Sequence, residues 1–208
     1  MRETATRHGA LLIFDEVITG LRVDLGGGQA RYGVTPDLGT FAKAVGAGLP
    51  LSVLAGKRQY MQLIASGEVV HAGSLNGNPI VLAGAKAALE TLRGGAREIY
   101  PRIRSLGEKL ASGIVGALRS AGMQAVSTGD GPVFAIHLQS EKPRTYRDTL
   151  AADTQIWSDF VLTLLDEGLL ILPDGRWYIS AAHSEADVDE ALRAVDRAAR
   201  SVGKEAGG

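Results

Sequence analysis

Cysteine is absent from the 208 residues, so disulfide bonds, thiolate zinc sites and cysteine nucleophiles are all excluded. Aromatic residues make up only 5% of the chain, which argues against the stacking surfaces that bind single-stranded nucleic acid. Neither sign of charge dominates, because 22 Lys and Arg residues stand against 23 Asp and Glu residues. The chain therefore lacks the basic excess by which proteins bind nucleic acid or anionic membranes.

Long apolar runs are also missing. The run Leu11–Phe14 ends at Asp15, whereas a secretory signal needs about 7–15 apolar residues and a membrane helix about 20. We therefore expect a cytoplasmic protein. Hydrophobic residues reach 45%, which is enough for a sizeable core. Glycine is in excess, since 27 residues are about 13% of the chain against an average of about 7%, and this predicts many tight turns.

The first half of the chain alternates short apolar runs with glycine-rich turns. Buried strands are predicted at Ala10–Phe14, Leu38–Phe41 and Ser52–Ala55, and the first is expected to be covered on both faces. Residues 25–32 contain three successive glycines and are predicted to form a loop. Asn78 followed by Pro79 predicts a helix start, because Asn caps helices and Pro is favoured at the first helical position. The alternation is typical of a three-layer α/β unit.

The second half begins with a long helix, which is followed by shorter predicted strands and helices separated by turns. Apolar residues at helical spacing predict a helix over residues 96–120. The remainder indicates a small α+β domain, with strands at residues 123–126, 133–138, 169–172 and 177–181 and helices at residues 156–167 and from 184 onward. We expect two domains, residues 1–95 and residues 96–208.

Asp15 and Lys43 are the first candidates for chemistry. Asp15 follows an apolar strand, where it could cap the next turn or serve as counter-ion to a buried cation at the carboxyl edge of a sheet. Lys43 follows another predicted strand and stands between Ala42 and Ala44, whose small side chains leave room for a planar ligand. A desolvated lysine in such a place is a candidate Schiff-base nucleophile, although a single lysine is usually a solvated surface residue.

The segment His71–Pro79, with the sequence HAGSLNGNP, is the third candidate. A hydroxyl group and free backbone N–H groups ahead of a helix can bind phosphate, and the same residues can equally form an ordinary capped helix start.

Together these segments resemble the class III pyridoxal-phosphate-dependent aminotransferases. The resemblance lies in LLIFDEVITGLRV, GVTPDLGTFAKAVGAGLPLSVLAGKR and HAGSLNGNP. The segments GLRVDLGGGQARYGVTPDL and RWYISAAHSEADVDEAL are most similar to the glutamate-1-semialdehyde 2,1-aminomutase branch. The resemblance implies an α/β fold of the fold type I transferases. Residues 1–95 would be the C-terminal part of the cofactor-binding large domain, with a mostly parallel sheet, and residues 96–208 the connecting helix and small domain.

The resemblance also implies a role for each of five residues. Lys43 matches the lysine that forms a Schiff base with pyridoxal 5'-phosphate and moves a proton during amino transfer. Asp15 matches the acid that pairs with the pyridine nitrogen, and Val17 the apolar residue on one ring face. Gly73 and Ser74 match the segment that reaches the phosphate of a neighbouring subunit's cofactor. We therefore expect a homodimer with shared active sites, a small amino or oxo substrate and no metal site.

Two departures from the family's pattern leave alternatives open. Met1 corresponds to a point inside the large domain, so the family's main phosphate loop and ring-stacking aromatic are expected upstream of it. Arg176 does not match the arginine with which many class III transaminases bind a substrate α-carboxylate, and this favours the aminomutase branch. The alternatives are a catalytically incomplete fragment that pairs with a complementary or full-length subunit, and an α/β binding module without cofactor.

Overall fold

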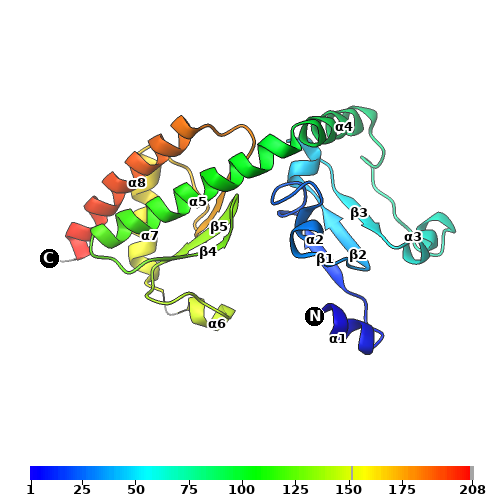
Figure 1. Ribbon diagram of the computed structural model, residues 1–208, viewed down its shortest axis with the longest axis horizontal. Helices are drawn as coiled ribbons and strands as arrows, with labels where there is room; N and C mark the ends of the chain where they lie inside the picture. Colours follow the sequence, from blue (N-terminus) through cyan, green and yellow to red (C-terminus); the bar gives the residue numbers. More distant parts are fainter. Residues whose placement is uncertain (151, 207–208) are drawn as a thin grey trace. The chain divides into compact units, whose positions relative to one another are not determined.

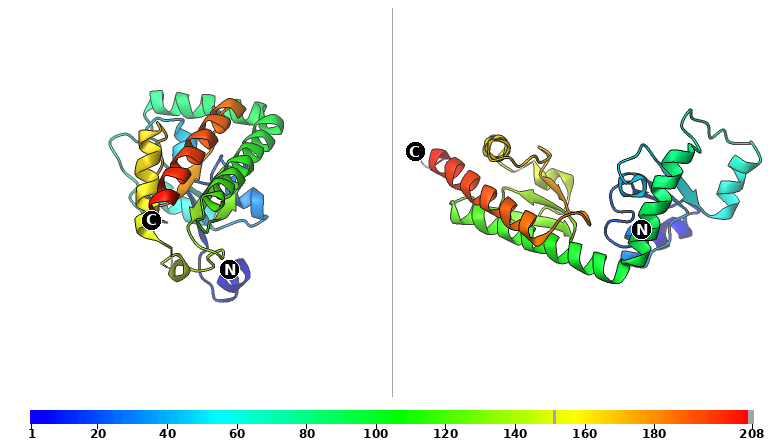
Figure 2. Two further views of the ribbon diagram at one scale, coloured as in Figure 1. Left: turned by 90° about the vertical axis from the view of Figure 1, so that its left-hand side faces the viewer. Right: turned by 90° about the horizontal axis from the view of Figure 1, so that it is seen from above.

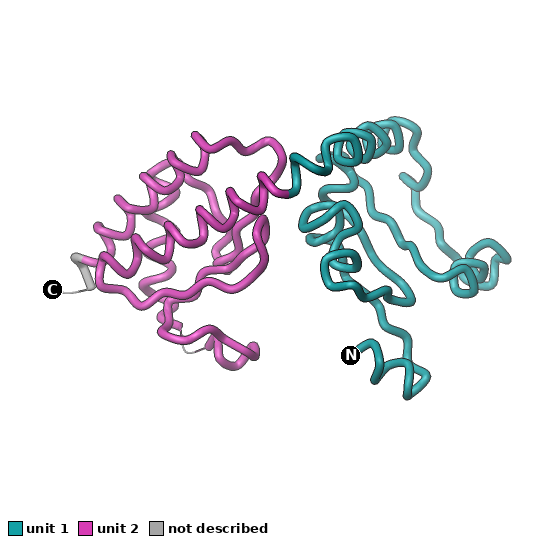
Figure 3. The backbone as a smooth tube through the Cα atoms, in the orientation of Figure 1, with its two compact units in different colours: residues 1–100 teal, residues 101–208 magenta. Residues whose placement is uncertain are grey.

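The chain forms two compact units, Met1–Tyr100 and Pro101–Gly208 (Figure 3). The computed structural model describes residues 1–150 and 152–206. Helix α5 (Ala96–Ser120) passes from the first unit into the second, and Pro101 lies inside this helix. The predicted division after residue 95 coincides with the start of α5, whereas the packing divides a few residues later. That the two units correspond to the family's large and small domains stays a prediction.

The first unit is built around a three-stranded sheet (Figure 1). Its elements ahead of α5 are α1 (Arg2–Arg7), β1 (Ile13–Glu16), α2 (Gly27–Tyr32), β2 (Leu38–Phe41), the 3₁₀ helix η1 (Lys43–Gly46), β3 (Val53–Gly56), α3 (Arg58–Ala65) and α4 (Pro79–Gly94). The three strands predicted from apolar runs are all present, each within a few residues of its expected position.

The sheet of the first unit is mixed and not mostly parallel, in the order β1-β2-β3. Strand β1 pairs with β2 in parallel, with Asp15 opposite Thr40, and β2 pairs with β3 antiparallel, with Leu38 opposite Gly56. The reason is the short connection through η1, because a parallel crossover needs about a dozen residues or more, usually including an α-helix. The chain instead turns back on itself and returns alongside β2.

Strand β1 is not buried on both faces, contrary to the expectation from its apolar sequence. Leu11 is 47% exposed and Ile13 is 56% exposed, whereas Glu16 at the end of the strand is buried. The described sheet ends at β1, so this strand has a free edge as well as an uncovered face. Parallel strands are normally covered on both faces, and this arrangement therefore leaves apolar surface without a partner.

Local sequence signals explain α4 but not α2. The side chain of Asn78 accepts hydrogen bonds from the backbone N–H groups of Ile80 and Val81, as predicted for a helix cap. Residues 27–32, predicted as part of a loop, form the helix α2. This helix depends on a tertiary contact, described below, that glycine-rich sequence alone does not reveal.

The second unit packs helices against an antiparallel sheet of order β4-β5-β6. Its further elements are β4 (Val126–Asp130), β5 (Val133–His137), α6 (Tyr146–Thr149), α7 (Thr154–Asp166), β6 (Arg176–Tyr178) and α8 (Glu185–Ala206). Helices α5 and α8 run side by side (Figures 1 and 2) and are linked by Lys109, whose Nζ lies 2.8 Å from Glu185 and 2.6 Å from Asp189. The core comes from both layers and includes Leu106, Ile114, Leu118, Phe134, Phe160, Leu164, Trp177, Ile179 and Val195.

Two strand predictions for the second unit are corrected. Strand β4 begins at Val126, where the predicted strand ends, and runs to Asp130. Only Gly131 and Pro132 form the hairpin turn, so residues 127–130 pair with β5. Residues 169–172 are apolar but form no strand. None of the helices in the described ranges 1–150 and 152–206 is long and apolar enough to cross a membrane.

Candidate active site

Asp15 and Lys43 lie at the same edge of the first unit's sheet. Asp15 is near the carboxyl end of β1, and Lys43 follows the carboxyl end of β2 by two residues. Because β1 and β2 are parallel neighbours, with Asp15 paired to Thr40, their carboxyl ends meet at one edge. Ligands of α/β proteins bind at this edge. The fold thus brings together the two residues that the sequence singled out first.

Lys43 has a strained backbone and a free amine. It is the first residue of η1 and has φ of 47°, in the left-handed region that non-glycine residues rarely adopt. Strain of this kind persists only where the surrounding structure enforces it, and it is concentrated at functional sites. The side chain is exposed, as is usual for a lysine, and is not desolvated in this structure. Within residues 1–150 and 152–206, the structure records no hydrogen bond or ion pair on its Nζ atom.

Asp15 is exposed as well. Its Oδ1 atom accepts a hydrogen bond of 3.0 Å from the backbone N–H of Val17, which turns the chain at the end of β1. This is the first of the two roles that the sequence allowed for Asp15, the capping of the turn that follows the strand. The second carboxylate oxygen makes no hydrogen bond in the described structure, so the turn leaves it available to another donor. Val17 is half-buried and directly follows the strand.

Gly73 and Ser74 are not joined to this edge by any recorded contact. Both are exposed in the turn ahead of α4, where the backbone N–H of Asn76 donates to the carbonyl of Gly73. In the part of the chain that the structure describes, neither residue hydrogen-bonds to Asp15 or Lys43. Their predicted role toward a second subunit's cofactor stays a prediction.

Glu16 is a buried carboxylate that the sequence interpretation missed. Its side chain is 1% exposed and accepts hydrogen bonds from Thr19 and from the backbone of Gly28 and Gln29. The signal that could have found it is the alternation of the strand, which turns Glu16 to the face opposite Asp15. A charged residue at an inward position has to be paired or hydrogen-bonded.

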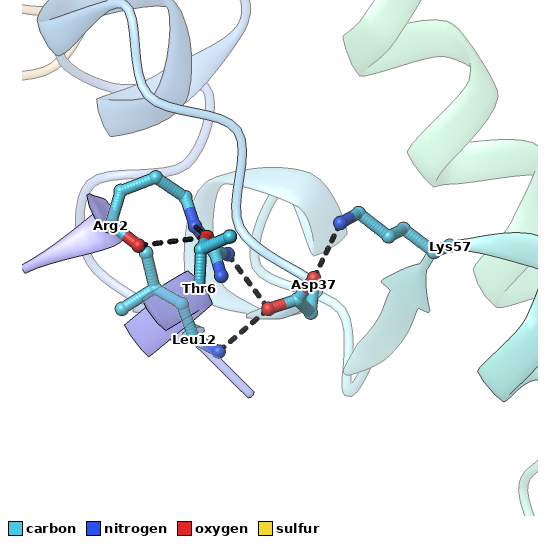
Figure 4. A network of polar contacts seen from close by, with 5 residues as sticks. All are labelled: Arg2, Thr6, Leu12, Asp37 and Lys57. Atoms are coloured by element: carbon cyan, nitrogen blue, oxygen red, sulfur yellow. Dashed lines mark hydrogen bonds and ion pairs between the residues drawn. The ribbon is translucent and has the colours of Figure 1, made fainter. Parts of the chain in front are cut away.

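Asp37 is a second buried carboxylate, at the opposite edge of the sheet (Figure 4). It precedes β2 and accepts hydrogen bonds from Leu12 N at 2.8 Å, Lys57 Nζ at 2.5 Å and Arg2 Nη1 at 2.7 Å. These contacts, first the backbone N–H of Leu12 and then the Lys57 and Arg2 side chains, hold the pKa of this carboxyl far below its usual range. The network ties α1, β1, β2 and the end of β3 together. It also engages Lys57, which is therefore a poor competitor of Lys43 for a ligand.

The depressed pKa of Asp37 predicts acid sensitivity of the first unit. A lowered pKa in the folded state stabilises the fold above the unfolded value of about 3.9, and this contribution is lost as the pH falls toward the folded value. We expect the strand amides of the first unit to lose hydrogen-exchange protection below about pH 4, and Asp37→Asn to weaken this pH dependence. Glu98→Gln, at an exposed position of the same unit, is the control. An unchanged acid profile in Asp37→Asn would show that the network contributes nothing to stability.

The profile of the family described as "Aminotransferase class-III" matches residues 1–198. The chain belongs to this family. One curated relative of the class III chain is the glutamate-1-semialdehyde 2,1-aminomutase of Dechloromonas aromatica (strain RCB). It is 38% identical over 199 residues, which are 94% of this chain and 46% of the relative. The chain thus spans about half the length of the curated relatives it matches.

Solved structures show the same partial correspondence. An ω-transaminase from Sphaerobacter thermophilus is 30% identical with a TM-score of 0.88, covering 98% of this class III chain and 47% of its own. A transaminase solved with pyridoxal phosphate (PLP) bound is 26% identical with a TM-score of 0.86, covering 100% and 48%. The α/β fold of the chain therefore matches fold type I transaminases over part of their length. The family uses pyridoxal phosphate.

The residues at the carboxyl edge fit part of this cofactor. The free carboxylate oxygen of Asp15 suits a protonated ring nitrogen, and the unpaired amine of Lys43 suits an aldehyde. Ala42 and Ala44 flank Lys43 with small side chains. Gly73 and Ser74, in the turn ahead of α4, have no recorded hydrogen bond to this edge within residues 1–150 and 152–206. The residues at the edge itself thus fit the ring and the aldehyde of the cofactor.

Proposed function

We propose that this class III chain carries out pyridoxal-phosphate-dependent amino-group transfer of the glutamate-1-semialdehyde aminomutase type. Lys43 is the proposed catalytic residue, and Asp15, Val17, Gly73 and Ser74 are the proposed cofactor-binding residues. The observation that carries the proposal is the placement of Asp15 and Lys43 at the carboxyl ends of neighbouring parallel strands. The substrate would be a small molecule with an amino or oxo group.

Each residue has a defined task in this proposal. When bound, pyridoxal phosphate supplies an aldehyde that condenses with amines and a ring that accepts electrons from the substrate carbon. Lys43 would hold the aldehyde until a substrate amine displaces its nitrogen, and the freed lysine amine would then carry the proton between the two carbons that exchange amino and oxo groups. Asp15 holds the proton on the ring nitrogen through its free oxygen, because a nearby carboxylate favours the charged form of that nitrogen. Val17 packs against the ring and excludes water.

Each active site would contain residues from two subunits. Ser74 lies in an exposed turn with no recorded contact to Lys43, so we propose that it binds the phosphate of a second subunit's cofactor in a homodimer. The mutase reaction and a transfer between two substrates require the same lysine and ring chemistry. The aminomutase type is favoured by the similarity to curated aminomutases.

A second candidate function is supported by exposed apolar surface. Ile13 on β1 and Leu11 just before it are exposed, and the described sheet has a free edge there. In the second unit, Leu170 is 83% exposed beside a pocket of about 600 Å³. In this alternative the exposed apolar residues would be covered by a partner, and the chain would act only when paired with a complementary or full-length subunit.

Cofactor trapping tests the proposal directly. The purified 208-residue chain is mixed with pyridoxal phosphate, reduced with borohydride and digested, and the modified lysine is identified by mass spectrometry. We expect one dominant adduct on Lys43. The same experiment with a complementary amino-terminal half added, followed by an amino-transfer assay, separates the two candidate functions. A dominant adduct on Lys57 or Lys86 would overturn the assignment.

A further inference from the structure

Glu16 separates the two proposed ring contacts, Asp15 and Val17, and faces away from Asp15. Its side chain is 1% exposed, whereas Asp15 is exposed. Successive side chains of a strand point to opposite faces. When the Glu16 side chain points into the protein, the Asp15 side chain therefore has to point to the opposite face of the strand.

Three donors hold the Glu16 carboxylate. The backbone N–H of Gly28 donates to Oε2 at 2.8 Å and that of Gln29 donates to Oε1 at 3.0 Å. The hydroxyl of Thr19 donates to Oε2 at 2.5 Å. Gly28 and Gln29 belong to the first turn of α2, whose N–H groups have no partner inside the helix. The carboxylate thereby anchors α2 and the connection that leads to it from β1.

Gly27 makes this close approach possible. It has φ of 65°, and a Cβ atom at this position would lie 2.7 Å from Oε2 and 2.9 Å from Oε1 of Glu16. Any other residue would combine backbone strain with a steric clash against the carboxylate. The successive glycines thus allow the helix to begin directly against a buried acid.

We infer that Glu16 is a positioning residue that, through α2, fixes Asp15 and Val17 at the carboxyl edge beside Lys43. The inference rests on the roles of Asp15 and Val17 in the proposed function. A slip of one residue in β1 would exchange the two faces of the strand and bury Asp15. Removing the Glu16 carboxylate from its three donors is costly, because the buried N–H group of Gly28 and the half-buried N–H group of Gln29 would lose their acceptor. Glu16 thereby specifies the register of the strand that carries the ring-nitrogen partner.

The test compares Glu16→Gln with Asp37→Asn. Both positions are buried carboxylates with three donors in the first unit, but Asp37 lies at the opposite edge of the sheet. Gln keeps the size of Glu and places an amide NH₂ against the N–H groups of α2. Two readouts are taken at a pH and temperature at which each variant is folded. They are the amide resonance of Val17, which reports its bond to Asp15, and the yield of borohydride-trapped cofactor on Lys43.

We expect Glu16→Gln to shift the Val17 resonance and to lower the Lys43 yield by about tenfold, the effect of losing one hydrogen bond to a charged group. The yield falls because Asp15 and Val17 are displaced together, whereas Asp15→Asn would keep the turn and the place of Val17. Asp37→Asn should lower the stability of the unit and leave both readouts at wild-type values. Thr19→Val removes one donor only, so it should fold and show a smaller change in the same direction. Wild-type readouts in Glu16→Gln and Thr19→Val, or equal losses in Asp37→Asn, would overturn the inference. Failure of the wild-type chain to trap cofactor on Lys43 would instead contradict the proposed function, and the Val17 resonance would still test Glu16.

Discussion

Replacing Lys43 with alanine is expected to abolish the borohydride-trapped cofactor adduct while the fold is retained. Lys43 is exposed and its amine has no recorded partner in the described part of the chain, so its side chain contributes little to packing. Alanine also lacks the only atom of this residue that can condense with an aldehyde. The left-handed backbone at this position is as unfavourable for alanine as for lysine, so the substitution adds no new strain. The measurement is the mass-spectrometric yield of reduced adduct in the variant and in the wild-type chain. Matching circular-dichroism spectra show that both chains are equally folded.

Lys86→Ala is the matched control for this experiment. Lys86 lies on α4 of the same unit, is exposed and makes only a surface ion pair of 3.6 Å with Glu90. Its loss should change neither the adduct yield nor the fold, because such pairs contribute little. An adduct that survives in Lys43→Ala and disappears in Lys86→Ala would assign the Schiff base to Lys86 and contradict the proposed role of Lys43.

The second large effect is expected for Asp15→Asn in a chain extended to the full length of its relatives. The asparagine Oδ1 atom can still accept the hydrogen bond from Val17, so the turn after β1 should be preserved. The neutral amide cannot hold a proton on the ring nitrogen. We therefore expect the cofactor adduct on Lys43 to remain and the amino-transfer rate to fall by about 100-fold or more, as for the loss of an acid–base group.

Glu90→Gln provides the comparison for Asp15→Asn, because it also neutralises an exposed carboxylate of the first unit. It should leave the rate unchanged. The decisive measurement is the ratio of turnover to trapped cofactor, which separates a loss of chemistry from a loss of binding. A near-normal ratio in Asp15→Asn would contradict the proposed role of this residue.

The sequence predicted the elements whose signals are local. Asn78 and Pro79 fixed the start of α4, and the helical spacing of apolar residues predicted α5 with its bounds. Apolar runs located the strands of the first unit. Helix α2 was missed because it depends on the Glu16 carboxylate, which is distant from it in sequence. The absence of a strand at residues 169–172 was missed for a related reason, since an apolar run does not reveal whether a neighbouring strand is present to pair with it.

The sequence singled out Asp15 and Lys43, which the fold places at one end of the sheet, but it did not predict their environment. Asp15 and Lys43 do meet at one sheet edge, because parallel pairing of β1 and β2 follows from the chain between them. Their exposure was not predicted, because burial depends on what covers a strand and not on the strand's own residues. Ile13 shows this most clearly, as an apolar residue of a strand with an open face. Glu16 shows the reverse case, a charged residue that the fold buries.

Pro101 lies inside α5 at the point where the two units divide. Proline has no backbone N–H, so the carbonyl of Arg97 loses its helical donor, and a proline inside a helix costs about 3 kcal/mol. Each unit packs its own set of buried residues on its side of this position. Heating should therefore give two calorimetric transitions, because cooperativity is not transmitted through a helix whose hydrogen-bond ladder is broken between two cores. The two parts of α5, before and after Pro101, are thus expected to unfold at different temperatures, each with its own unit.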